Sequence, residues 1–375
     1  MKENNEMKKQ KSIYEKWAED EINVVYAEPM EYFPKEIRKE YKLGEYAESE
    51  VQKKIKAVML GHAVGDALGV PVEFCSREEL AENPVTDMRG WGSYPVPEGC
   101  WSDDTSMSLA ALDSLAKGKV NYNEVMLNFV RWTTLNEYTP SGEMFDIGRT
   151  CLSAIRNYLH SDGADALKSG LDDEHSNGNG SLMRIHPFAL FLYYKGLNEN
   201  KYIEVIHNAS ALTHAHERSK MACGIYTFIL WELLNNPCRG SIIRGLNQAS
   251  EYYGHYKEYP IYDRMLMKRI GRIYRCREDI DDYKGVTCDE IKSSGYVVDT
   301  LEAAIWCVLT TQDYKSCVLK AVNLGGDTDT VAAVAGGLAG ALYGLESIPE
   351  EWLGKLKRKE YIEMMCEQAG NSWKQ

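Results

Sequence analysis

Hydrophobic positions along most of the chain recur with the period of an α-helix. Val51, Ile55, Val58, Met59 and Ala63 follow a 3.6-residue spacing, which places apolar side chains on one face of a helix. No convincing run alternates apolar and polar residues, as strands do, and no G-x-G-x-x-G follows a strand. The fold class is therefore predicted to be all-α. Further helices are predicted at 104–117, 122–135, 145–159, 182–194, 202–212, 217–235, 240–253, 263–276, 297–310, 313–322, 330–343 and 350–368.

The first predicted helix carries a glycine at every fourth position, at Gly61, Gly65 and Gly69. Glycine costs helix stability, so a stripe of this kind indicates that another backbone packs closely against it. The small apolar segment 331–340 is predicted to be a helix that is buried on most sides.

Residues 1–50 differ in composition from the remainder, because 22 of these 50 residues are charged, against 77 of the other 325. A plain solvated tail would hold few aromatic residues, yet this segment has seven. We expect an arm of short helices, the first over 12–21, that docks on a main domain at 51–375. A surface for a partner protein is the alternative. The aromatic residues are Tyr14, Trp17, Tyr26, Tyr32, Phe33, Tyr41 and Tyr46.

The net charge of −13 makes nucleic acid an improbable partner, since phosphate-backbone binders need clustered basic residues. The longest near-apolar run, 331–344, is shorter than the roughly 20 residues of a spanning helix, and the N-terminus lacks an apolar signal region. We expect a cytoplasmic protein without membrane insertion. The ten cysteines include no Cys-x-x-Cys, which fits buried thiols in a reducing compartment.

Two acidic strings, 101–107 and 325–331, carry the candidate chemistry. Ser102 is predicted to cap a helix whose first turn holds Asp103 and Asp104. Asp327 and Asp329 are two residues apart, and in an extended turn both can converge on one point. In the structural alternative, the carboxylates only decorate the starts of two helices.

Hard divalent cations take their ligands from carboxylates, hydroxyls and water. The four aspartates, together with Ser102 and Thr330, offer such oxygens, so a binuclear Mg²⁺ or Mn²⁺ site is the functional interpretation. Asp327-x-Asp329-x-Val331 also matches the aspartyl-phosphate motif of haloacid-dehalogenase-like phosphatases. That match is rejected because the motif ends a strand near the start of an α/β domain, whereas here it follows a helical segment.

Seven short motifs between about residues 58 and 344 occur in the same order as in the ADP-ribosylglycohydrolase family, and through them the chain resembles that family. This family includes dinitrogenase-reductase-activating glycohydrolase and the ADP-ribosyl-acceptor hydrolases. The resemblance implies an all-α fold with two Mg²⁺ or Mn²⁺ ions at the base of a cleft. The motifs are 61–69 with Pro71 and Glu73, 101–105, 146–148, 178–184, Thr213-His214, 295–301 and 325–330.

The resemblance also implies roles for individual residues. Glu73 matches a glutamate that family members place beside the metals, near the ribose whose bond is cleaved, and it is the first candidate for proton transfer. Asp146 matches an acidic residue that bacterial members place against the same ribose, and it is the second candidate. Arg149 stands where bacterial members often have Asn, near the leaving group. The family often has Thr at the position of Ser102, and Asp104 is also predicted to be catalytic. The implied metal ligands are Ser102, Asp103, Asp104, Asp327, Asp329 and Thr330.

The implied substrate residues are Gly148, Asn179, Gly180, His214 and Tyr296. Backbone N–H groups at Gly148 and Gly180 are candidates for the pyrophosphate, and Tyr296 for stacking on the adenine. Four of these residues have a structural alternative: an ordinary turn for Asn179 and Gly180 in the Gly-Asn-Gly segment, and a packed core residue for His214 and for Tyr296. Asp66 is interpreted as a hydrogen-bond acceptor and not as a ligand.

The predicted function is hydrolysis of the bond between ribose C1 and an acceptor, which releases ADP-ribose from a modified protein or a small molecule. A binding or immunity-type protein on the same fold, which blocks an ADP-ribosyltransferase through residues 1–50, is the alternative. The complete acidic set favours the enzyme, because a protein that has lost catalysis usually loses its ligands first.

Overall fold

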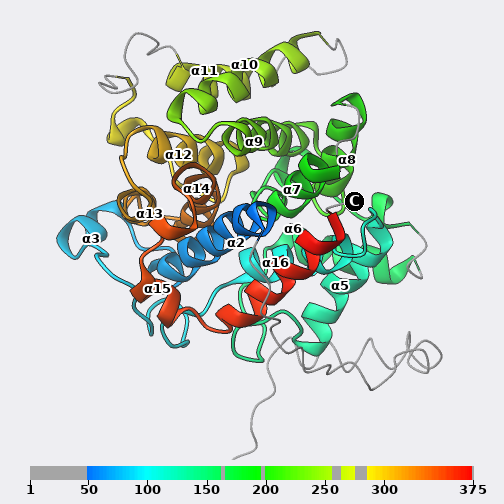
Figure 1. Ribbon diagram of the computed structural model, residues 1–375, viewed down its shortest axis with the longest axis horizontal. Helices are drawn as coiled ribbons and strands as arrows, with labels where there is room; N and C mark the ends of the chain where they lie inside the picture. Colours follow the sequence, from blue (N-terminus) through cyan, green and yellow to red (C-terminus); the bar gives the residue numbers. More distant parts are fainter. Residues whose placement is uncertain (1–48, 162–164, 196–198, 256–262, 275–284, 374–375) are drawn as a thin grey trace, which may run out of the picture. The chain divides into compact units, whose positions relative to one another are not determined.

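The computed structural model describes residues 49–161, 165–195, 199–255, 263–274 and 285–373 (Figure 1). The chain divides into two units, Met1–Tyr46 and Ala47–Gln375, and every described residue belongs to the second. The predicted arm at 1–50 therefore lies outside the described residues, apart from Ser49 and Glu50. Ser49 caps the first described helix, which begins at Glu50.

The described residues form helices joined by loops, which confirms the all-α prediction (Figure 1). Two isolated β-bridges, Leu171 with His214 and Gly178 with Tyr296, are the extended pairings within them. The α-helices are α2 (Glu50–Gly69), α3 (Arg77–Glu82), α4 (Asp103–Leu115), α5 (Tyr122–Leu135), α6 (Arg149–His160), α7 (His186–Lys195), α8 (Glu199–Ala211), α9 (Glu217–Asn235), α10 (Arg239–His255), α11 (Asp263–Tyr274), α12 (Val297–Leu309), α13 (Tyr314–Val322), α14 (Thr328–Tyr343), α15 (Glu350–Lys355) and α16 (Lys359–Trp373); short 3₁₀ turns are η2 (Val70–Val72), η3 (Ala166–Lys168), η4 (Glu174–Ser176), η5 (Cys288–Glu290) and η6 (Leu345–Ser347).

Three predicted helices differ clearly from the structure, and one short helix was not predicted. The helix predicted from 145 begins at Arg149, because Asp146 adopts a left-handed φ of 52° that interrupts a helix. The helix predicted from 182 begins at His186. The segment 350–368 forms α15 and α16, separated near Arg358, whose φ is 48°. Helix α3, which was not predicted, starts with a capping box between Ser76 and Glu79.

Helices α2 and α14 form the centre of the fold and pack with their backbones in direct contact (Figure 1). A Cβ atom added at Gly65 would lie 2.1 Å from the carbonyl oxygen of Ala332, and one at Gly336 would lie 2.3 Å from that of Gly61. Real Cβ atoms do not approach backbone this closely, so glycine is required at both positions. The close packing predicted from the glycine stripe is confirmed.

Helix α2 with η2, Glu50–Val72, is long and apolar enough to cross a membrane by length and composition, which the sequence analysis did not anticipate. Its apolar window is entirely buried inside the fold, which is typical of a core helix. Helices α4, α7, α13 and α16 complete its surroundings.

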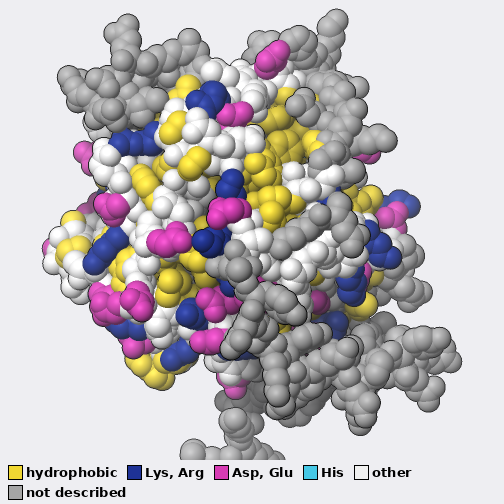
Figure 2. Space-filling view, viewed as in Figure 1, with side chains coloured by type: hydrophobic (Ala, Val, Ile, Leu, Met, Phe, Trp, Pro, Cys, Tyr) yellow, Lys and Arg dark blue, Asp and Glu magenta, His cyan; other side chains and the backbone are white. Residues whose placement is uncertain are grey.

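The face of the molecule drawn in Figure 2 carries basic side chains interspersed with acidic and apolar ones. The described part of this face therefore lacks the extended basic surface that a phosphate backbone requires.

Replacing Gly65 with alanine should lower the free energy of unfolding by about 3 kcal/mol, because the added methyl overlaps the α14 backbone. The control is Gly271→Ala in α11, where a Cβ would meet nothing within 4 Å. That variant should be neutral or stabilised by up to about 1 kcal/mol. Urea denaturation of both proteins measures the difference, and equal stabilities would contradict the packing described here.

Candidate active site

The two acidic strings meet at the first turns of α4 and α14. The hydroxyl of Ser102 caps α4 by accepting a hydrogen bond from the backbone N–H of Asp104, at 3.3 Å. The hydroxyl of Thr330 donates to Asp104 Oδ2 at 3.2 Å, which joins the two strings directly. Their predicted convergence is confirmed. One detail differs, because Asp329 lies inside the first turn of α14 and not in an extended turn.

Asp66, on α2, fixes the start of α4. Its carboxylate accepts hydrogen bonds from the backbone N–H groups of Ser102, at 2.8 Å, and Thr105, at 3.0 Å, and from the Thr105 hydroxyl at 2.6 Å. The expectation that Asp66 is a hydrogen-bond acceptor is confirmed. Complete burial raises its pKa to about 7, although these hydrogen bonds act in the opposite direction.

Glu73, Asp327 and Asp329 bring their carboxylates to one point, where one oxygen from each lies within 4.8 Å of the others. Asp329 and Asp104 are each only 1% exposed. Burial raises the pKa values of Asp103, Asp104 and Asp329 well above the ordinary range, and repulsion from neighbouring carboxylates adds to the effect.

Glu73, Asp104, Asp327 and Asp329, here called the acidic cluster, each have an oxygen atom that no described protein group satisfies. Buried oxygens without a hydrogen-bond partner are Glu73 Oε2, Asp104 Oδ1, Asp327 Oδ1 and Asp329 Oδ2. In the described part of the chain, none of these four residues forms an ion pair with a lysine, arginine or histidine. Buried carboxylates are costly unless a cation compensates them, and hard divalent cations prefer such oxygens. The cluster can therefore hold a metal ion.

Glu73 belongs both to this cluster and to a second group of side chains. Burial raises its pKa to about 9, and repulsion from Asp146 and Asp327 adds to the shift. The nearby Tyr94 hydroxyl lowers the pKa values of both Glu73 and Asp146, but burial outweighs this effect and raises the pKa of Asp146 to about 6. Tyr94 was not predicted, because it lies in a loop without a recognisable motif. The structure thus brings both predicted proton-transfer residues together.

Asn179 forms a further wall of the cluster. Its Nδ2 donates to Asp327 Oδ2 and to the Thr300 hydroxyl, both at 2.9 Å. Its backbone N–H donates to the carbonyl of Gly295 at 3.0 Å. Asn179 therefore orients one of the cluster carboxylates, which an ordinary turn residue would not do.

Gly180 and His214 lie together beside Asn179. A Cβ at position 180 would lie 2.7 Å from the sulfur of Cys151 and 2.9 Å from Cε1 of His214. Burial lowers the pKa of His214 to about 3. Its Nδ1 forms a hydrogen bond with the Thr213 hydroxyl at 2.8 Å. The imidazole is therefore neutral and fixed in place. The contact with Cys151 was not predicted.

The other predicted substrate residues lie at loop positions. Gly148 is the exposed N-cap of α6, and no side chain caps that helix. The neighbouring Arg149 is also exposed. Tyr296 is the N-cap residue of α12 and is half-buried, with the guanidinium carbon of Arg218 at 5.8 Å from its ring centre.

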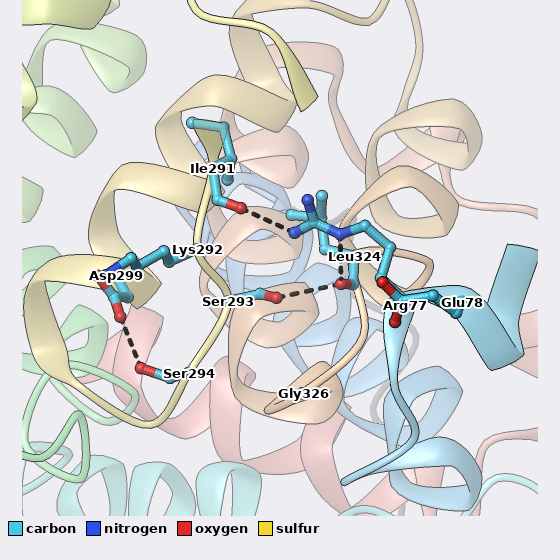
Figure 3. A pocket seen from close by; sticks show the side chains of 9 residues that line it. All are labelled: Arg77, Glu78, Ile291, Lys292, Ser293, Ser294, Asp299, Leu324 and Gly326. Carbon is cyan, nitrogen blue, oxygen red and sulfur yellow. Dashed lines mark hydrogen bonds between the residues drawn. The ribbon is translucent and has the colours of Figure 1, made fainter. Parts of the chain in front are cut away.

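A separate cavity of about 540 Å³ adjoins the second acidic string through Gly326 (Figure 3). None of the carboxylates of the acidic cluster lines it. Arg77 reaches into this region and donates to the carbonyls of Leu324, Cys288 and Ile291 at 2.7–2.9 Å. Through these hydrogen bonds, the Arg77 guanidinium joins α3 to η5 and to the end of α13. The role of Arg77 in this cavity is therefore structural.

Comparison with known proteins agrees with the geometry of this site. The profile of the ADP-ribosylglycohydrolase family matches residues 47–375. The chain belongs to this family. It is therefore a hydrolase that cleaves a glycosyl bond of ADP-ribose, as the sequence analysis predicted.

Individual relatives match over most of the chain. An ADP-ribosylarginine hydrolase, Tri1 of Serratia proteamaculans, is 35% identical over 86% of this chain and 80% of its own. The ADP-ribosyl-[dinitrogen reductase] glycohydrolase of Rhodospirillum rubrum is 33% identical over 80% and 89%. A solved ADP-ribosylglycohydrolase-related protein complex contains a chain that superimposes with a TM-score of 0.68 at 29% identity, over 87% of this chain and 99% of that one.

Replacing Asp66 with asparagine should lower the free energy of unfolding by about 2–4 kcal/mol, because an amide cannot accept all three hydrogen bonds that hold the start of α4. Chemical denaturation in the presence of chelator measures this without a contribution from metal binding. Asp289→Asn, at an exposed position in η5, is the matched control and should leave stability unchanged. A similar effect of the two substitutions would contradict the role of Asp66.

Proposed function

We propose that this chain is a metal-dependent hydrolase that removes ADP-ribose from modified arginine side chains of proteins. The observation that carries the proposal is the acidic cluster, with four buried carboxylate oxygens that lack a partner. Relatives that are ADP-ribosylarginine hydrolases support the choice of acceptor. The bond that breaks joins ribose C1 to a guanidinium nitrogen.

The carboxylates and hydroxyls of both strings would hold two Mg²⁺ or Mn²⁺ ions. When bound, such ions would supply Lewis acidity toward the ribose hydroxyls and toward water. The hydrogen bond from Thr330 to Asp104 joins the two strings, which supports a site formed by both. The proposed ligands are Ser102, Asp103, Asp104, Asp327, Asp329 and Thr330.

Glu73 is the proposed proton-transfer residue, with Asp146 beside it. As the C1–nitrogen bond breaks, positive charge develops on the ribose, and these two carboxyl groups are proposed to act at that carbon. A water oxygen forms the new bond to C1, and a proton passes to the leaving guanidine. Carboxyl groups with raised pKa values are suited to transfer protons near neutral pH, as the shifts of both residues support.

The ADP-ribose portion is proposed to lie along the loops of Asn179 and Tyr296. Asn179 holds Asp327 in place, and the backbone N–H groups of Gly180 and Gly148 are proposed to meet the pyrophosphate. Neutral His214 forms the wall behind Gly180, and Tyr296 offers a ring face to the adenine.

Wild-type protein should release ADP-ribose from ADP-ribosylarginine on a protein, and exhaustive chelation should abolish that release. Asp329→Asn should lower kcat about a hundredfold or more without lowering the melting temperature, because it removes one of several repelling buried carboxylates. Asp289→Asn is the control and should retain full activity. Mass spectrometry of released ADP-ribose across arginine- and serine-linked substrates measures this. Full activity after chelation would contradict the metal-dependent mechanism.

Residues 1–50 are proposed to act as a separate arm that narrows substrate choice or binds an ADP-ribosyltransferase. A chain that starts at Ala47 tests this, because it retains Ser49, the cap of α2. We expect the shortened chain to fold, to accept bulkier ADP-ribosylated substrates, and to lose any inhibition of a partner transferase. An unchanged substrate range and unchanged inhibition would contradict both roles.

A further inference from the structure

Two large aromatic side chains are exposed in a backbone conformation that bulky residues rarely adopt. Phe74 has a φ of 69° and is 71% exposed, and Trp91 has a φ of 58° and is 72% exposed. Left-handed backbone at a bulky residue is strained, and it persists only where the surrounding structure enforces it. Strain of this kind clusters at functional sites, so what enforces it is informative.

The contacts that hold these two residues lead to Glu73 and to the second acidic string. The backbone N–H of Phe74 donates to the carbonyl of Gly326 at 2.7 Å, and the N–H of Gly326 donates to the carbonyl of Cys75 at 2.8 Å. The backbone of Phe74 is therefore fixed against that of Gly326, and Glu73 and Asp327, the sequence neighbours of these two residues, belong to the acidic cluster.

The loop that carries Trp91 is fixed to the same segment. The backbone N–H of Ser93 donates to the carbonyl of Pro71 at 3.0 Å, and its hydroxyl donates to the carbonyl of Glu73. A Cβ at Gly92 would lie only 1.7 Å from the carbonyl oxygen of Pro71. Trp91 is thus presented from a loop that packs tightly beside Glu73.

The same loop also reaches into the site. Tyr94, three residues after Trp91, has its ring centre 5.1 Å from that of Phe145, the residue before Asp146, and its hydroxyl influences the pKa values of Glu73 and Asp146. These loops differ from those proposed for ADP-ribose, which carry Asn179 and Tyr296. Phe74 and Trp91 therefore stand on the segments that carry Glu73, away from the loops assigned to ADP-ribose.

We propose that Phe74 and Trp91, here called the acceptor rim, bind the ADP-ribosylated guanidinium of the substrate through their aromatic faces. The inference rests on the proposed function and names the residues that select its acceptor. An aromatic face attracts a guanidinium, especially from Arg.

Steady-state kinetics of full-length, Mg²⁺-loaded protein test the acceptor rim with two substrates, ADP-ribosylarginine on a protein and ADP-ribosylated agmatine. Phe74→Ala and Trp91→Ala should each raise KM about two- to fivefold for both substrates, and the double variant about tenfold. The kcat should stay within about twofold. Trp91→Phe keeps an aromatic face and should restore most of the affinity.

The dissociation constant for ADP-ribose, measured by calorimetry, should stay unchanged in all these variants, because ADP-ribose lacks the acceptor. Phe74→Gly separates recognition from stability: it relieves the left-handed strain and should raise the melting temperature, yet raise KM as Phe74→Ala does. Leu167→Ala, which removes an exposed apolar side chain on η3, is the control and should change neither constant.

Several results would overturn the acceptor rim. These are an unchanged KM in the active variants, a parallel loss of ADP-ribose affinity, an effect confined to the protein substrate, or a change of oligomeric state in place of a change in KM. An absence of hydrolysis of ADP-ribosylarginine by the wild-type protein would instead overturn the proposed function. The two failures are therefore distinguishable.

Discussion

The backbone contact between α2 and α14 is the constraint on which the rest of the structure depends. At the end of α2, a Cβ on Gly69 would lie 2.3 Å from the Cα of Asp329. The hydroxyl of Thr328 donates to the carbonyl of Gly69 at 2.8 Å. The first turn of α14 is therefore seated on the last turn of α2, and any larger residue at position 69 would push the second acidic string away.

The same helix also places the first string. Asp66 lies one turn before Gly69 and accepts the hydrogen bonds that fix the start of α4. A single helix thus positions both groups of carboxylates, although they are more than 200 residues apart in the sequence. The cost is a concentration of buried like charges, which the raised pKa values of Asp103, Asp104 and Asp329 record. The close backbone contact of α2 with α14 holds the two strings together against that repulsion.

The sequence was informative where the physical cause is local. The glycine stripe, the Ser102 cap and most helices follow from spacing and capping, so they could be predicted. The resemblance to the family brought the two strings together, whereas their spacing alone left a structural alternative open. The left-handed backbone at Asp146 could not be predicted, because no local residue requires it. Tyr94 and the acceptor rim were missed for a related reason, since contacts with distant loops fix them. The roles of the ligands and substrate residues remain predictions.

Glu73 lies at the boundary between two kinds of structure. Its carboxylate belongs to the acidic cluster, whose other members stand on the first turns of α4 and α14, while its backbone carbonyl receives the hydroxyl of Ser93 from a surface loop. Helices hold the chemistry of the site in a fixed geometry, and loops form the surface that an acceptor meets. Loops tolerate substitution more readily than packed helices. A change in Phe74, Trp91 or their neighbours can therefore alter which acceptor is accepted without disturbing the cluster, whereas a change at Gly65, Asp66 or Gly69 would displace the carboxylates themselves.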